Sequence, residues 1–135
     1  MARRLRFRAE RRVAAARVHG AIAATLALHT STADRCWFAV WNGFGGLRDD
    51  VRCAPIFHLP HREYNLLTGP LDAATESVED GVGVRSPNIW WPDDHTWCVA
   101  TEIDLNTTYI ACSKVCRDDI LSLPSIEALA IKTAT

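Results

Sequence analysis

The chain has 135 residues, of which 48% are hydrophobic and 23% charged, and its formal net charge is −1. This length suits one hydrophobic core, and the apolar content is too high for an intrinsically disordered chain. No uninterrupted apolar run approaches the ~18 residues of a membrane span, and no convincing cleavage site follows the N-terminal apolar stretch, so we expect a cytoplasmic protein.

The charges are distributed unevenly along the chain. Residues 1–20 contain seven arginines and one glutamate, a local net charge of +6, so residues 21–135 carry −7. We therefore expect a basic N-terminal arm over residues 1–20, either disordered or a frayed helix, and a single domain over residues 21–135. Such an arm could attract nucleic acid, but it lacks the repeated aromatic residues that stack on bases, so we expect it to be solvated.

The five cysteines show no regular spacing and no C-x-x-C motif, which excludes the usual zinc-ribbon and thioredoxin signatures. An odd number also argues against a disulfide framework. We expect reduced thiols that serve as small interior residues, and no cofactor.

The first predicted element is an amphipathic helix. Ala14, Val18, Ile22 and Leu26 recur at helical spacing, and the pattern ends near His29. A polar connector then leads to the segment that follows.

Residues 36–41 (CWFAVW) predict a strand that is apolar on both faces and therefore central in its sheet. Residues 47–55 are typical of a charged loop. The runs 56–59 and 64–68 predict a hairpin. Residues 71–78 favour a short helix, because proline at position 70 is tolerated at a helix start.

Residues 79–92 contain glycines and prolines and predict a loop. Residues 97–105 alternate as a half-buried strand does, and residues 108–112 predict a further strand. Ser113 is a plausible N-cap for a last helix, and residues 126–129 indicate one more helical turn.

Together these elements predict an α+β fold. We expect an antiparallel sheet of about four to five strands, with an N-terminal helix and a C-terminal helix packed on it.

The most unusual segment is residues 88–97, which holds three of the five tryptophans. One interpretation is a partner-binding loop in which exposed Trp90 and Trp91 anchor a protein, with Arg85, Asp93 and Asp94 as a polar rim. The other interpretation is structural: one or both of these tryptophans close the end of the sheet, while the two aspartates cap a turn.

An alternative function is a small metal-dependent or acid-base enzyme centred on Asp93, His95, Glu102 and Asp104. Neighbouring side chains in a strand diverge, and no second histidine stands at helical spacing from His95. We therefore expect no metal site. The pair His58 and His61, in a predicted turn, favours solvated side chains over chelation.

Three segments together resemble a family of small uncharacterised proteins from high-GC bacteria. They are WFAVWNGFGGL (37–47), LPHREYNLLTGPL (59–71) and SPNIWWPDDHTWCVATEID (86–104). More distantly, the W-N-G-x-G turn and the helix-then-sheet order are similar to the SUKH superfamily of immunity proteins, which neutralise toxins by binding them. These resemblances imply a non-enzymatic protein-binding module, such as an immunity-type inhibitor, rather than an enzyme.

Overall fold

A computed structural model describes residues 2–6, 12–80, 85–101, 107–124 and 126–131. Within them the helices and strands follow one another in this order: β1 (Ala2–Arg6), α1 (Arg12–Ala27), β2 (Cys36–Trp41), α2 (Asp49–Arg52), β3 (Ile56–Leu59), β4 (Arg62–Gly69), the 3₁₀ helix η1 (Leu71–Thr75), β5 (Ile89–Pro92), β6 (Cys98–Thr101), β7 (Thr107–Ala111), α3 (Lys114–Leu121) and β8 (Ala128–Ala130).

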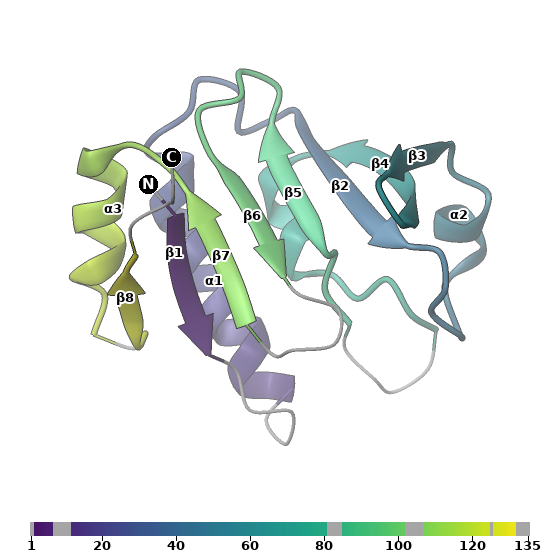
Figure 1. Ribbon diagram of the computed structural model, residues 1–135, viewed down its shortest axis with the longest axis horizontal. Coiled ribbons are helices and arrows are strands. Elements are labelled where there is room, and N and C mark those ends of the chain that lie inside the picture. Colours follow the sequence, from purple (N-terminus) through teal and green to yellow (C-terminus); the bar gives the residue numbers. More distant parts are fainter. Residues whose placement is uncertain (1, 7–11, 81–84, 102–106, 125, 132–135) are drawn as a thin grey trace.

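The strands in the described ranges form one eight-stranded sheet in the order β3-β4-β2-β5-β6-β7-β1-β8 (Figure 1). Every neighbouring pair is antiparallel. The expected α+β class and antiparallel sheet are confirmed, and β2 lies inside the sheet as its two apolar faces indicate. The sheet is wider than the four to five strands predicted.

The extra width comes from three strands that the sequence does not predict. Residues 79–92 were expected to form a loop, but their last four residues form β5, which pairs with β2 on one side and β6 on the other. Residues 126–129 were expected to form a helical turn, but β8 (Ala128–Ala130) forms an edge strand of the sheet there. Within the predicted basic arm, β1 pairs with both β7 and β8. These short strands are stabilised by their neighbours rather than by local pattern.

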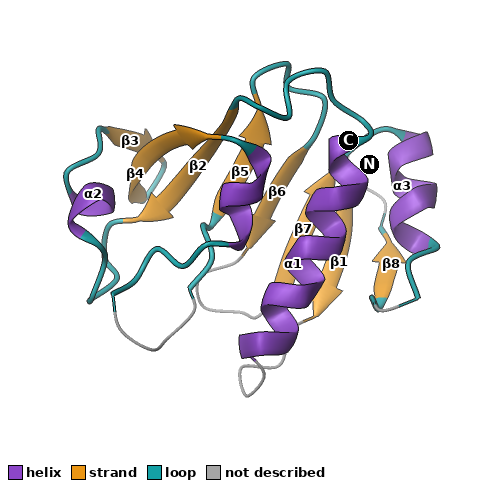
Figure 2. Cartoon of the chain, turned by 180° about the vertical axis from the view of Figure 1, so that it is seen from behind, coloured by secondary structure: helices purple, strands orange, loops and turns teal. Residues whose placement is uncertain are grey.

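The helices gather on one side of the sheet. Figure 2 shows α1 crossing in front of the strands, whereas the strands lie in front of α1 in the opposite view of Figure 1. Ile22 and Leu26 of α1 are fully buried in the main core, as their spacing predicts, together with Trp90 of β5 and Ile110 of β7. Each such side chain contributes about 1.5–3 kcal/mol by leaving water.

The last helix, α3, begins where the sequence places its cap. The Ser113 hydroxyl accepts a hydrogen bond from the Cys116 backbone N–H at 3.2 Å, which satisfies one of the free donors of the first turn. Cys116 and Ile120 face the main core, as predicted. Among the described residues, no helix combines the length and apolar character needed to cross a bilayer.

A second, smaller core lies near α2. Val51 of α2 packs with Val40 of β2 and with Leu47 and Val78 from the adjoining loops. Because Val40 points to the same side as the main core, both cores lie on the helix-covered side of the sheet.

Candidate protein-binding face

The side of the sheet opposite the helices carries large apolar side chains. Since Cys36, Phe38 and Val40 point to the two cores, alternation along β2 directs Trp37 and Trp41 to the other side. The same argument, with the strand register, gives the apolar outward residues of strands β2 to β7, here called the open face: Trp37, Ala39, Trp41, Phe57, Leu59, Tyr64, Leu66, Ile89, Trp91, Cys98, Ala100, Tyr109 and Ala111. Arg62, Thr68 and Thr107 lie on the same side of their strands.

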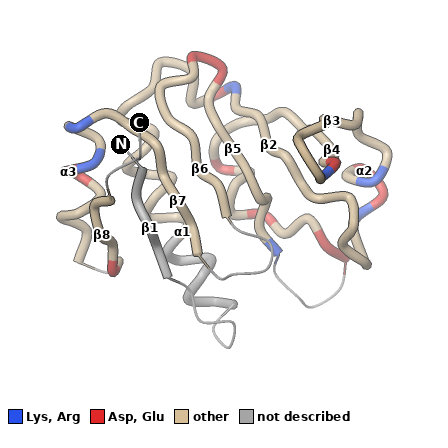
Figure 3. Tube along the Cα trace, in the orientation of Figure 1, with Lys and Arg blue, Asp and Glu red and all other residues tan. Residues whose placement is uncertain are grey.

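The middle of the open face lacks charge altogether. No residue of β2, β5, β6 or β7 is Asp, Glu, Lys or Arg, and Figure 3 shows these strands without a coloured segment. An antiparallel sheet with one face in water normally alternates apolar and polar residues. The departure from that pattern indicates a face that is not built to remain in water.

Aromatic rings lie together over the centre of the open face. Trp37 is paired in register with Trp91, whose ring centroid lies 6.1 Å from that of Phe57. Phe57 in turn lies 6.5 Å from Tyr64. Ala39, which lies between Leu66 and Ile89 in the strand register, is fully buried although it points away from the helices. Trp37, Phe57 and Trp91 themselves stay partly exposed. They form a rigid platform of the kind that anchors protein interfaces.

A second aromatic group stands at the end of β2. The Trp41 ring meets Phe44 edge-on at 5.0 Å, and the Arg62 guanidinium lies 5.2 Å from the Trp41 ring centroid. A Cβ added at Gly43 would come within 2.2 Å of the Trp41 ring, so only glycine allows the indole to lie against this turn.

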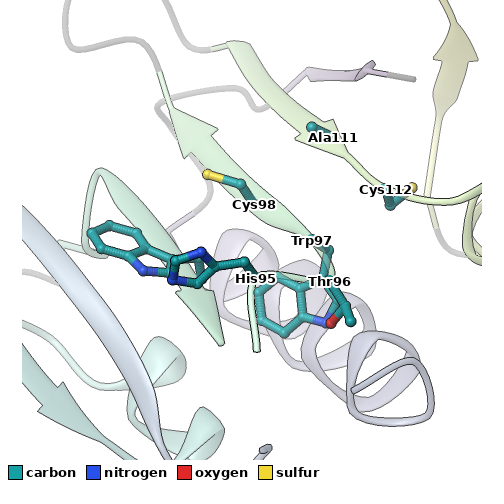
Figure 4. A pocket seen from close by; sticks show the side chains of 7 residues that line it. His95, Thr96, Trp97, Cys98, Ala111 and Cys112 are labelled. Carbon is teal, nitrogen blue, oxygen red and sulfur yellow. The ribbon is translucent and has the colours of Figure 1, made fainter. Parts of the chain in front are cut away.

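A pocket of about 450 Å³ opens on the open face at the end of the β5–β6 hairpin (Figure 4). Trp91, Trp97 and Ala111 supply apolar walls, and His95 and Cys98 add an imidazole and a thiol. Burial raises the pKa of the Cys98 thiol, so this sulfur is a neutral wall atom rather than a thiolate nucleophile. The complete lining is Trp91, His95, Thr96, Trp97, Cys98, Ala111 and Cys112.

His95 enters the pocket lining from an unusual backbone conformation. Its φ is +58°, in the left-handed region, and its N–H donates to the Pro92 carbonyl at 3.0 Å to close the turn. Glycine or asparagine occupies such positions at lower energy.

The hairpin turn is fixed by Asp94. Its carboxylate accepts hydrogen bonds from the Thr30 hydroxyl at 2.8 Å, the Ser31 N–H at 2.9 Å and the Thr96 hydroxyl at 2.8 Å. Partial burial acts to raise the pKa of Asp94, but the hydrogen bonds from Ser31, Thr30 and Thr96 outweigh it and hold that pKa well below its usual range. The carboxylate therefore stays charged, with neutral groups as its donors.

The expected role of Trp90 as an exposed anchor is wrong. Trp90 is fully buried, and its ring meets that of Trp97 at 5.6 Å in the main core. Strand alternation explains the difference, because β5 sends Trp90 to the helix side and Trp91 to the open face. The structural interpretation, in which a tryptophan fills the interior and an aspartate caps a turn, is confirmed for Trp90 and Asp94.

The predicted polar rim is also divided. Asp93 follows β5, where it accepts a hydrogen bond from the Trp37 indole at 3.1 Å and pairs with Arg35 at 3.6 Å. Arg85 precedes β5, pairs with Glu79 and lies 3.9 Å from the centre of the Phe44 ring. The two residues therefore lie at opposite ends of the strand and do not form one rim.

The residues of the alternative enzyme hypothesis do not assemble in the described part of the chain. Asp93 and Asp94 are engaged as above, while Glu102 and Asp104 lie outside the described residues. His61 has φ +70° in the β3–β4 turn, and His58 pairs with Glu63 at 3.4 Å. The described residues contain no group of three or more His, Cys, Asp or Glu placed to hold a metal ion.

The sequence did not single out Trp37 or Phe57 as site residues. The signal that could have found them is the uncharged composition of residues 36–41, 89–92 and 107–111 taken together, which is unusual for strands with a solvent face. Comparison with family models, with curated proteins and with solved structures finds no significant match to this chain. The resemblances given above therefore stay predictions.

Proposed function

We propose that this protein is a non-enzymatic protein-binding module whose partner covers the open face. One observation carries the proposal: the solvent side of four adjacent strands bears aromatic and aliphatic residues and no charge. Interface centres are depleted in charge and enriched in tryptophan and tyrosine.

The partner of such a face is more plausibly a folded protein than a small molecule. The aromatic platform of Trp37, Phe57, Tyr64 and Trp91 spreads over β3, β4, β2 and β5, whereas a small-molecule site is concave and closed around its ligand. An inhibitor of the immunity type, as the sequence resemblance implies, would need a surface that binds a folded protein. Its partner would then be a toxin.

The proposal is tested by partner capture with matched variants. The protein is immobilised as wild type, as Trp91→Glu on the open face, and as Val115→Glu on α3, whose side chain is 67% exposed away from that face. We expect the wild type and Val115→Glu to capture the same partner and Trp91→Glu to lose at least about tenfold, which corresponds to about 1.4 kcal/mol.

Circular dichroism and thermal melting of the three proteins check that each is folded. Equal capture by a folded Trp91→Glu variant would remove the open face as the binding surface.

A further inference from the structure

We infer that the pocket beside Trp91 receives a basic side chain, arginine or lysine, from the protein that binds the open face. The inference rests on the proposed function and adds the chemistry of the partner at this point. It is carried by an uncovered tryptophan, a pocket of suitable shape and a negatively charged rim.

The chain itself shows how two of its partly exposed aromatic rings are covered. Arg62 lies over Trp41 at 5.2 Å, and Arg85 lies over Phe44 at 3.9 Å. Trp91 has Phe57 beside it at 6.1 Å, but in the described part of the chain no arginine or lysine stands over its ring. The face of the Trp91 ring is thus available to a basic group of another molecule, as the rings of Trp41 and Phe44 are to arginine within the chain.

The pocket suits the long stem of a basic side chain. Trp91, Trp97 and Ala111 provide apolar surface, and His95 also lines the pocket. Figure 4 shows the labelled lining residues. Lysine and arginine bury their aliphatic stems against such walls and keep their charged ends at the rim. A volume of about 450 Å³ is ample for one side chain.

The rim at this end of the sheet is negative. Asp93 and Asp94 lie in the β5–β6 turn, directly before the lining residues His95 and Thr96, whereas Asp34 lines a separate pocket on the helix-covered side. Arg35 pairs with Asp93 at 3.6 Å, while Asp94 is held by neutral donors. A cation on the partner would be attracted to this rim, and a carboxylate would be repelled.

Four small probes separate a basic group from a merely apolar one: N-acetyl-arginine amide, N-acetyl-lysine amide, N-acetyl-norleucine amide and N-acetyl-glutamate amide. Each is titrated into the full-length protein while NMR records the indole N–H of Trp91 and the backbone amide of His95. We expect the two basic amides to shift both signals at millimolar concentration, at least about fivefold more tightly than norleucine amide, and glutamate amide to cause no shift.

Matched variants localise the effect. Replacing Asp93 by asparagine keeps the size of the side chain and should reduce arginine-amide binding to the norleucine level. Asp72→Asn, on η1 and away from the pocket, should change nothing. Added salt should weaken the arginine amide and leave norleucine amide unchanged.

Equal binding of arginine and norleucine amides, or no shift with any probe, would overturn the inference. These results leave the proposed function standing if Trp91→Glu still loses its captured partner. If capture is also unaffected by Trp91→Glu, the proposed function fails as well, so the two failures are distinguishable.

Discussion

At the scale of single residues, His19 makes stability depend on pH. It is 4% exposed, its ring lies 6.2 Å from Trp90, and burial lowers its pKa from 6.5 to about 4 despite a hydrogen bond to the Ala74 backbone. As the pH falls, the His19 imidazole therefore takes up a proton at a higher pH in the unfolded chain than in the folded chain.

The contribution of neutral His19 to the free energy of unfolding is fully present above pH 6.5. It declines as the pH falls toward 4, by about 3 kcal/mol in total. Urea denaturation between about pH 7 and pH 5 measures it, with His19→Gln as the matched variant that cannot titrate. The wild type should lose more stability over this window than His19→Gln does. Parallel curves for the two proteins would contradict the account.

Trp90 and Trp91 are adjacent in sequence and opposite in role. Trp90→Ala should lower the free energy of unfolding by about 3–5 kcal/mol, because it leaves a large cavity in the main core. Trp91→Ala should lower it by only about 1 kcal/mol, since its ring is partly exposed. Urea denaturation of the two variants decides the matter, and similar losses would mean that β5 is not oriented as described.

At the scale of elements, Asp94 joins the β5–β6 turn to the loop between α1 and β2. Its carboxylate accepts from Thr30 and Ser31 on one side and from Thr96 on the other. Asp94→Ala should lower the free energy of unfolding by about 2–3 kcal/mol, since several donors lose a charged acceptor.

Amide exchange should also become faster at Ser31. The control is Asp72→Ala, an exposed residue of η1, which should cost less than about 0.5 kcal/mol. A loss no larger than that of the control would show that the turn does not depend on Asp94.

The elements that sequence pattern predicts are those with a strong local signal. The aromatic run of β2, the β3–β4 hairpin and the Ser113 cap of α3 each depend on residues close together in the chain. The strands β5 and β8 depend on partners far away, and β5 holds only four residues ending in proline. Ile89, Trp90 and Trp91 favour a strand, but the run is short and lies between Pro87 and Pro92, so pairing with β2 and β6 decides its structure.

The site was predictable only in part for the same reason. The sequence located Trp91 and Asp94, because clustered tryptophans and carboxylates are conspicuous in any chain. It could not assign Trp90 and Trp91 to opposite faces without recognising β5 as a strand. Nor could it show that the helices leave one face uncovered, because that depends on how the whole chain packs.

At the scale of the whole molecule, β1 ties the two ends of the chain into one sheet. It pairs with β7 on one side and with β8 on the other, and β8 has no other strand partner in the described ranges. Deleting residues 1–6 should therefore lower the thermal midpoint and remove hydrogen-exchange protection from Ala128–Ala130. The lost ladder hydrogen bonds contribute about 1 kcal/mol each. Unchanged melting and protection would instead support the solvated arm that the sequence predicts.

The open face is the central claim at this scale, and site-specific photo-crosslinking tests it most directly. A benzophenone amino acid replaces Tyr109, 37% exposed on the open face, or Val115 on α3 as the control. Irradiation in the native cells should give a discrete protein adduct from position 109 and none from position 115. The same adducts from both positions, or none from position 109, would contradict a partner bound on this face.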